Sequence, residues 1–245
     1  MVAWGPGVVA KLFHAKYASA VDLELERARA VESLGAPCPS VLGTVEHEGR
    51  SGILYERIEG PLLSEGLREG AGAVERVAER LAELHVRIHA IQVPAESPLP
   101  RLRAWLARYL GSFPEPQRSR AELELARVAD GTGLCHMDLH PLNVIVRGDE
   151  LVVVDWVNAC SGPLSLDAGR SFQLMAHMGA QKREGARQAM RLALAGRYCA
   201  TISARAGFSP GELERAIGFA GAALLRDQPE NPFAPELRAA APWLA

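Results

Sequence analysis

The sequence predicts an α+β fold in which a small β-rich part, residues 1–60, precedes a larger, mostly helical part, residues 61–245. Short runs rich in β-branched and aromatic residues, bounded by glycine and proline, occupy much of the first part. Stretches with hydrophobic residues at spacings of three and four dominate the second. A chain of 245 residues has the size of one compact unit with two lobes.

The elements of the β-rich part follow in a simple order. A glycine-proline-glycine turn precedes the first strand, and a Gly-Ala-Pro sequence stops the helix that comes next. A turn around Gly49 then joins two further strands. The expected elements are a strand at Val8–Phe13, a helix at Val21–Leu34, and strands at Val41–His47 and Gly52–Ile58.

The second part begins after a Glu-Gly-Pro sequence near Glu59–Leu63. Its first long stretch, Ala73–Ile91, has one hydrophobic face and predicts an amphipathic helix. A compact β pair interrupts the helices, and an alanine-rich helical region starts at Ser165. Besides the first helix, the expected elements are helices near Arg101–Leu110 and Arg118–Ala129 and strands at Asn143–Val146 and Leu151–Val154.

Composition excludes several classes of protein. Hydrophobic residues make up 48% of the chain and charged residues 23%, a balance that allows a buried core. The net charge of −2 and the absence of a long apolar run predict neither a nucleic-acid partner nor a membrane span. The four cysteines show no CxxC spacing, and the N-terminus does not resemble a secretion signal. We therefore expect a cytoplasmic protein with reduced cysteines.

The segment Leu134–Trp156 contains the most informative polar residues. Asp138 and Asn143 lie five positions apart in an expected loop, and Asp155 follows a run of valines at an expected strand end. The hairpin between them folds the chain back, so that two carboxylates and one amide gather at one edge. Oxygen ligands of this kind suit Mg²⁺ bound to phosphates, and phosphoryl transfer also needs a residue that orients the attacking hydroxyl.

This segment resembles the catalytic region of the aminoglycoside phosphotransferase and choline kinase-like family. The run HMDLHPLN, residues 136–143, is similar to the H-G-D-L-H-x-x-N loop of that family and to the H-x-D-x-x-x-x-N loop of protein kinases. Asp155 stands where the family has its counterpart of the kinase D-F-G aspartate. The resemblance implies a bilobal protein-kinase-like fold, with Asp138 orienting the acceptor hydroxyl, Asn143 and Asp155 binding Mg²⁺, and Asp167 bracing the loop.

The resemblance extends to the nucleotide site. Lys11, in the sequence VVAKLF, is similar to the strand lysine that binds the ATP phosphates, and its carboxylate partner is expected on the next helix. Glu24 and Glu26 compete for this role, and the helical stripe together with the family spacing favours Glu24. The sequence ILYERIEG is similar to the kinase hinge, which implies that the Glu56 carbonyl and the Ile58 amide hold adenine.

Three departures from the family pattern stand out. Met137 replaces a small glycine, and Gly162-Pro163 lacks the intervening aspartate of G-D-P. The first strand and the glycine-rich phosphate-covering loop have no counterpart, since about ten residues precede Lys11 and a strand pair needs roughly twenty. Either Met1 is a truncated start or the protein has lost the loop, and weak ATP binding is expected of the chain as given.

A zinc site is the alternative for the histidines. His136 and His140 flank Asp138, and His85 and His89 are four residues apart, yet no glutamate follows His85 as H-E-x-x-H requires. We expect His136 to be a buried residue that bonds the loop, and His85 and His89 to be satisfied core residues or partly exposed.

The sequence thus predicts an enzyme that transfers phosphate from Mg-ATP to a hydroxyl of a small molecule. The alternatives are a non-catalytic nucleotide-binding pseudokinase and a minimal, atypical protein kinase. Residues 182–245 contain nine Lys and Arg against six Asp and Glu. In the family that region forms much of the acceptor site, so we expect an acceptor other than a polycationic aminoglycoside.

Overall fold

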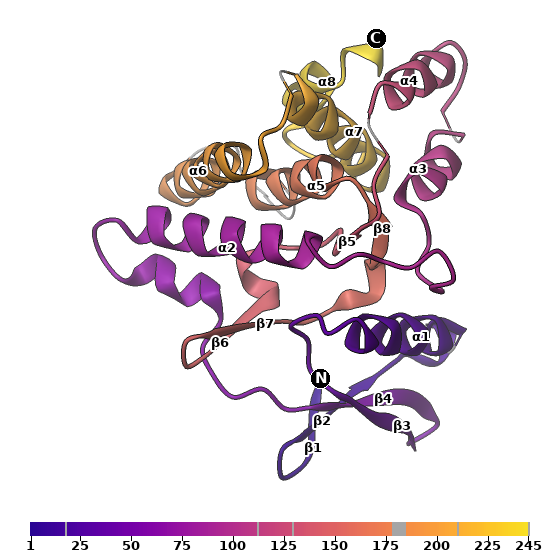
Figure 1. Ribbon diagram of the computed structural model, residues 1–245, viewed down its shortest axis with the longest axis vertical. Helices are drawn as coiled ribbons and strands as arrows, with labels where there is room; N and C mark the ends of the chain where they lie inside the picture. Colours follow the sequence, from indigo (N-terminus) through magenta and orange to yellow (C-terminus); the bar gives the residue numbers. More distant parts are fainter. Residues whose placement is uncertain (18, 112, 129, 178–184, 210, 245) are drawn as a thin grey trace.

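Four strands near the start of the chain form an antiparallel sheet in the computed structural model, in the order β1-β2-β4-β3 (Figure 1). Gly7 turns β1 into β2 with a φ of +69°, a left-handed conformation that glycine adopts without steric cost. The strands are β1 Val2–Gly5, β2 Val8–Leu12, β3 Val41–His47 and β4 Arg50–Glu56. The structure describes residues 1–17, 19–111, 113–128, 130–177, 185–209 and 211–244.

Helix α1, Ser19–Ser33, packs against β3 and β4. It buries Val21, Ala28 and Val31 together with the carboxylate-bearing Glu24. The helix also contacts the short 3₁₀ turn η4, Trp156–Asn158, which directly follows Asp155. α1 therefore links the sheet to the segment that carries the polar residues of interest.

Helices form most of the remainder (Figure 1). The face of α2 predicted to be apolar is buried and packs on α6, while α5 contacts both α6 and α7. None of the helices in the described part of the chain has the length and hydrophobicity that crossing a membrane requires. The helices are α2 Ala73–His89, α3 Leu102–Leu110, α4 Gln117–Ala126, α5 Leu164–His177, α6 Ala186–Ala206, α7 Glu212–Asp227 and α8 Ala234–Ala240.

Two small antiparallel pairs lie between the sheet and the helices (Figure 1). β5 Gly133–Cys135 pairs with β8 Cys160–Gly162, and β6 Val144–Arg147 pairs with β7 Glu150–Val153. The Val153 amide donates to the Pro37 carbonyl at 2.7 Å, which ties β7 to the segment after α1. These pairs fix the two loops that contain Asp138 and Asp155.

The structure confirms β3 as predicted and places most other elements within two or three residues of the prediction. Two details of the catalytic segment differ from the prediction. Asn143 ends a 3₁₀ turn, Pro141–Asn143, instead of starting β6, because proline favours the first position of a helical turn. Asp155 lies two residues beyond β7, with a left-handed φ of +67°. Residue 129, the expected end of α4, lies outside the described residues.

Candidate active site

Lys11 forms ion pairs with two carboxylates from different parts of the chain. Its Nζ lies 2.7 Å from Glu24 Oε1 on α1 and 2.9 Å from Asp155 Oδ1. Burial alone would lower the pKa of Lys11, but the charge of Asp155 and the charge and hydrogen bond of Glu24 raise it overall. The lysine is therefore held as a cation between the sheet, α1 and the segment after β7.

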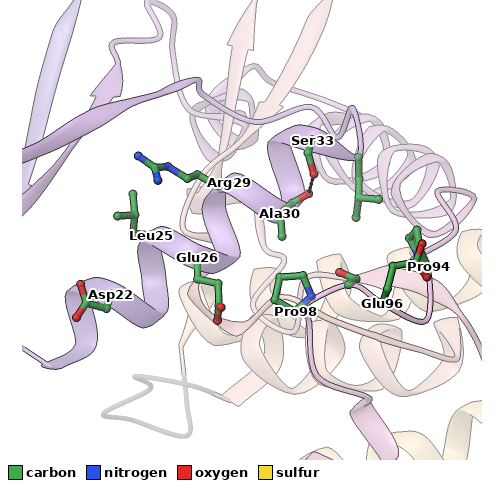
Figure 2. Close-up of a pocket in the computed structure, with 11 residues that line it drawn as sticks. Asp22, Leu25, Glu26, Arg29, Ala30, Ser33, Pro94, Glu96 and Pro98 are labelled. Carbon is green, nitrogen blue, oxygen red and sulfur yellow. Dashed lines mark hydrogen bonds between the residues drawn. The ribbon is translucent and has the colours of Figure 1, made fainter.

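The geometry distinguishes the two candidate glutamates, of which the sequence analysis favoured Glu24. Glu24 is buried and contacts Lys11, whereas Glu26 lines a hollow of about 540 Å³ on another side of α1. Figure 2 shows the Glu26 side chain directed toward Pro98, in the loop that follows α2. Glu24 is the residue that the structure pairs with Lys11.

Tyr55, which belongs to the hinge-like sequence ILYERIEG, is a third member of this group. Its hydroxyl donates to Glu24 Oε1 at 3.2 Å. Burial and the neighbouring carboxylate of Glu24 raise the pKa of the phenol well above its usual value, so the hydroxyl keeps its proton. Tyr55 and Lys11 together fix the orientation of the Glu24 carboxylate.

Asn143 holds the carboxylate of Asp138. The Asn143 Nδ2 group donates to Asp138 Oδ2 at 3.1 Å and to the Asp138 carbonyl at 2.9 Å. Burial raises the pKa of Asp138, although the charges of His140 and Arg170 act in the opposite direction. His140 Nε2 lies 4.0 Å from Asp138 Oδ2, and burial lowers the pKa of His140. A carboxylate with a raised pKa is a better proton acceptor.

Asp167 holds the backbone of the loop that contains Asp138, as predicted. It is fully buried and accepts the backbone N–H groups of His136 at 2.6 Å and Met137 at 2.8 Å. His85 Nε2 lies 2.9 Å from Asp167 Oδ2 without the alignment of a hydrogen bond. Met137 has a φ of +62°, the left-handed region that suits the glycine of the family pattern and is strained for other residues.

His136, His85 and His89 all have partners within the fold. The backbone N–H of Asp138 donates to His136 Nδ1 at 3.1 Å, and His136 Nε2 lies 3.2 Å from the Val154 carbonyl. Burial lowers the pKa of His136 to about 4, so the ring is neutral near pH 7. His85 contacts the Tyr198 hydroxyl at 2.6 Å, and His89 the Gly162 carbonyl at 2.9 Å. His136 is thus the buried, loop-bonding residue that the sequence predicted.

We expect Asp167→Asn to lower the free energy of unfolding at pH 7 by about 3–5 kcal/mol, because it breaks a buried charged network. Burial alone would raise the pKa of Asp167, but His85, His136 and the backbone N–H donors lower it overall. Its contribution is therefore present above the ordinary pKa of about 3.9 and is lost as pH falls toward the folded-state pKa.

Urea unfolding at neutral and acidic pH measures this effect. Asp149→Asn, in the β6–β7 turn, removes an exposed carboxylate and is the matched control. The wild type should lose more stability on acidification than Asp167→Asn. Equal stability of Asp167→Asn and Asp149→Asn at pH 7 would show that the brace contributes nothing.

A cavity of about 430 Å³ brings the predicted nucleotide and metal residues together. The side chain of Glu56 contacts Arg147, at 3.2 Å between Oε1 and Nη1. Cys38 also lines the cavity, and burial raises the pKa of its thiol to about 12, so it carries no thiolate near pH 7. Of the residues predicted from the sequence, the lining includes Lys11, Glu24, Glu56, Ile58, Asn143 and Asp155.

The residues present fit a Mg²⁺ ion. Asn143 and Asp155 both line the cavity, and amide and carboxylate oxygens are ligands of the kind that Mg²⁺ prefers. The described residues contain no cluster of three or more His, Cys, Asp or Glu that could hold a metal by themselves. Mg²⁺ in phosphate-binding sites needs only one or two protein ligands besides phosphate oxygens and water, so this sparse set is sufficient.

The fold is protein-kinase-like. It combines a small antiparallel sheet and α1, joined by the ion pair of Lys11 with Glu24, with a larger helical part. The chain belongs to the phosphotransferase enzyme family (APH), whose model matches residues 2–208. No curated protein sequence was found to match the chain.

Solved structures share the fold at low sequence identity. An aminoglycoside-3'-phosphotransferase of type VIII is 20% identical, with a TM-score of 0.54 over 85% of this chain and 82% of its own. Aminoglycoside phosphotransferase APH(3'')-Id from Streptomyces rimosus, in complex with ADP and streptomycin, is 19% identical, with a TM-score of 0.53 over 87% and 85%. The amicoumacin kinase hAmiN, in complex with AMP-PNP and Ca²⁺, is 14% identical, with a TM-score of 0.54 over 97% and 80%.

Proposed function

We propose that this small-molecule phosphotransferase uses Mg-ATP to phosphorylate an alcohol. The observation that carries the proposal is the convergence of Lys11, Asn143 and Asp155 on one cavity, with Asn143 also holding Asp138. Structural neighbours in complex with ADP and with AMP-PNP support nucleotide use. In this proposal the Glu56 carbonyl and the Ile58 amide hold adenine, and Lys11, oriented by Glu24, binds phosphate oxygens.

The remaining polar residues have roles in the transfer. Asn143 and Asp155 would hold Mg²⁺, which neutralises charge on the phosphates when bound. Asp138 orients the acceptor hydroxyl and accepts its proton. The acceptor oxygen bonds to the γ-phosphorus, and the bond from that phosphorus to the β–γ bridging oxygen breaks, leaving its electron pair on ADP. The in-line geometry depends on positioning by the two loops.

The proposal is tested by ADP release from Mg-ATP in the presence of a panel of hydroxyl-bearing metabolites and antibiotics. We expect at least one compound to stimulate ADP release and to appear as a phosphate ester by mass spectrometry. Nucleotide binding with no transfer to any compound would favour the non-catalytic pseudokinase instead.

We further propose that the acceptor is not a polycationic aminoglycoside, although structural neighbours include aminoglycoside phosphotransferases. The excess of basic residues in 182–245 supports this, because several ammonium groups call for an acidic site. Residues 182–184 of that segment lie outside the described residues. Kanamycin and gentamicin at micromolar concentration should not stimulate ADP release, and stimulation by either would refute the proposal.

A further inference from the structure

A second, smaller cavity lies beside the catalytic loop and is separate from the nucleotide cavity. Its volume is about 220 Å³, and its walls come from α1, α3, α5, α7 and the segments that flank Asp138 and Asp155. Met137 precedes Asp138, and Asn158 closes the turn that follows Asp155. The polar and aromatic residues of the lining are Arg27, Trp105, Asn158, Arg170 and Asp227.

Arg170, on α5, is the unusual residue of this cavity. Its Nη1 atom is buried and has no hydrogen-bond partner among the described residues. Its positive charge also acts on the carboxylate of Asp138 and opposes the rise in the pKa of that group. A buried guanidinium nitrogen left without a partner is costly, so its retention beside a catalytic carboxylate points to a partner supplied by a ligand.

The other charged residues of the lining, Arg27 and Asp227, already have partners within the fold. Arg27 donates to the Val157 carbonyl, which fixes the turn after Asp155, and Asp227 also has a partner in the fold. Two arginines against one aspartate leave the lining with an excess of positive charge. Arg170 is therefore the group in this cavity suited to bind an added anion, and guanidinium binds carboxylate with two parallel hydrogen bonds.

The volume limits the size of the ligand. Cavities that enclose drug-sized molecules measure about 300–1,000 Å³, so a space of about 220 Å³ suits a metabolite of only a few carbon atoms. The apolar part of the lining, with Met137, Cys160 and Ala223, would pack against a short carbon chain.

We infer that this cavity binds the acceptor, and that the acceptor is a small hydroxy acid whose carboxylate binds Arg170 while its hydroxyl faces Asp138. The inference rests on the proposed phosphotransferase function and adds the substrate class. Arg170 then acts as a specificity-determining residue, because it selects an acceptor by the group at the end opposite the hydroxyl.

Two sets of matched probes test the inference by ADP release with Mg-ATP. The first is 4-hydroxybutyrate, 1,4-butanediol and 4-amino-1-butanol, and the second is D-glycerate, glycerol and 3-amino-1,2-propanediol. Within a set the probes keep a hydroxyl for transfer and differ mainly in the charge of the far end. We expect the acid of at least one set to have the highest kcat/KM.

Arg170→Gln should lower the ratio of kcat/KM for the acid to that for the diol or triol about ten- to a hundredfold. The ratio is the decisive readout, because any effect of Arg170 on Asp138 changes both rates alike and cancels. Arg170→Lys should keep part of the preference, since it keeps the charge but not the paired hydrogen bonds. Arg118→Gln, an arginine on α4 that pairs with Glu115, is the matched control and should leave the ratio unchanged.

A preference for the neutral or the amino probe in both sets, or an unchanged ratio in Arg170→Gln, overturns the inference and leaves the phosphotransferase function standing. The inference is also overturned if none of the six probes accepts phosphate. In that case ADP release with the wider panel of hydroxyl-bearing metabolites and antibiotics decides separately whether the proposed function survives.

Discussion

Replacing Asp138 with asparagine is expected to lower kcat for phosphate transfer by about 10² to 10⁴, because the variant can no longer accept the proton of the acceptor hydroxyl. Asparagine keeps the size of the side chain, so the neighbouring Asn143 and the loop braced by Asp167 should keep their positions. Asp138 is not among the residues that line the nucleotide cavity, and the affinity for Mg-ATP should therefore hardly change.

The pH dependence gives an independent check of the same role. Burial raises the pKa of Asp138, so the acid limb of the wild-type rate profile should lie above the usual carboxyl range near pH 3.9. Activity should fall as pH drops through that raised pKa. Asp149→Asn, which removes an exposed carboxylate, should behave like the wild type. Activity of Asp138→Asn within a factor of two of the wild type would exclude the proposed role.

Replacing Asp155 is expected to abolish the tightening of ATP binding by Mg²⁺, because the cavity loses its carboxylate ligand for the ion. The choice of variant matters, since Asp155 has a φ of +67°. Alanine is strained in this left-handed conformation, whereas asparagine tolerates it. Asp155→Asn therefore removes the charge with little change in backbone energy, and Asp155→Ala removes both the charge and the oxygen ligands.

Calorimetric titration of ATP with Mg²⁺ and with a chelator measures the effect. In the wild type the dissociation constant should be lower with Mg²⁺, and in Asp155→Ala the two values should coincide. In Asp155→Asn the effect of Mg²⁺ on the dissociation constant should be intermediate between those in the wild type and in Asp155→Ala, because the variant retains one oxygen ligand. If Asp155→Ala keeps the full Mg²⁺ enhancement while folded, as judged by circular dichroism, the metal assignment is wrong.

The sequence predicted the parts of the site that depend on local spacing. Asp138 and Asn143 lie five residues apart in one loop, and the helical stripe of α1, together with the spacing implied by the family resemblance, favoured Glu24 over Glu26 as the neighbour of Lys11. The apolar periodicity of α2 predicted its buried face. These features follow from residues close together in the chain, where turn geometry and helical period determine which side chains share a face.

Contacts between distant residues could not be predicted in the same way. The hydrogen bond from Tyr55 to Glu24 joins residues 31 positions apart, and the bond from Arg27 to the Val157 carbonyl spans 130. No periodicity relates such residues, because tertiary packing alone brings them together. The left-handed backbone at Asp155 was likewise missed, since a valine run predicts a strand that continues to its last residue.

We propose that a Mg-nucleotide binds in the cavity between the sheet and the catalytic segment. Hydrogen exchange measured by mass spectrometry, with and without millimolar Mg-AMP-PNP, tests it without knowledge of the acceptor. Exchange should slow at residues 53–58 and 143–156, which contribute to the cavity, and stay unchanged in α7. Unchanged exchange in both cavity segments at saturating nucleotide would contradict the assignment of the site.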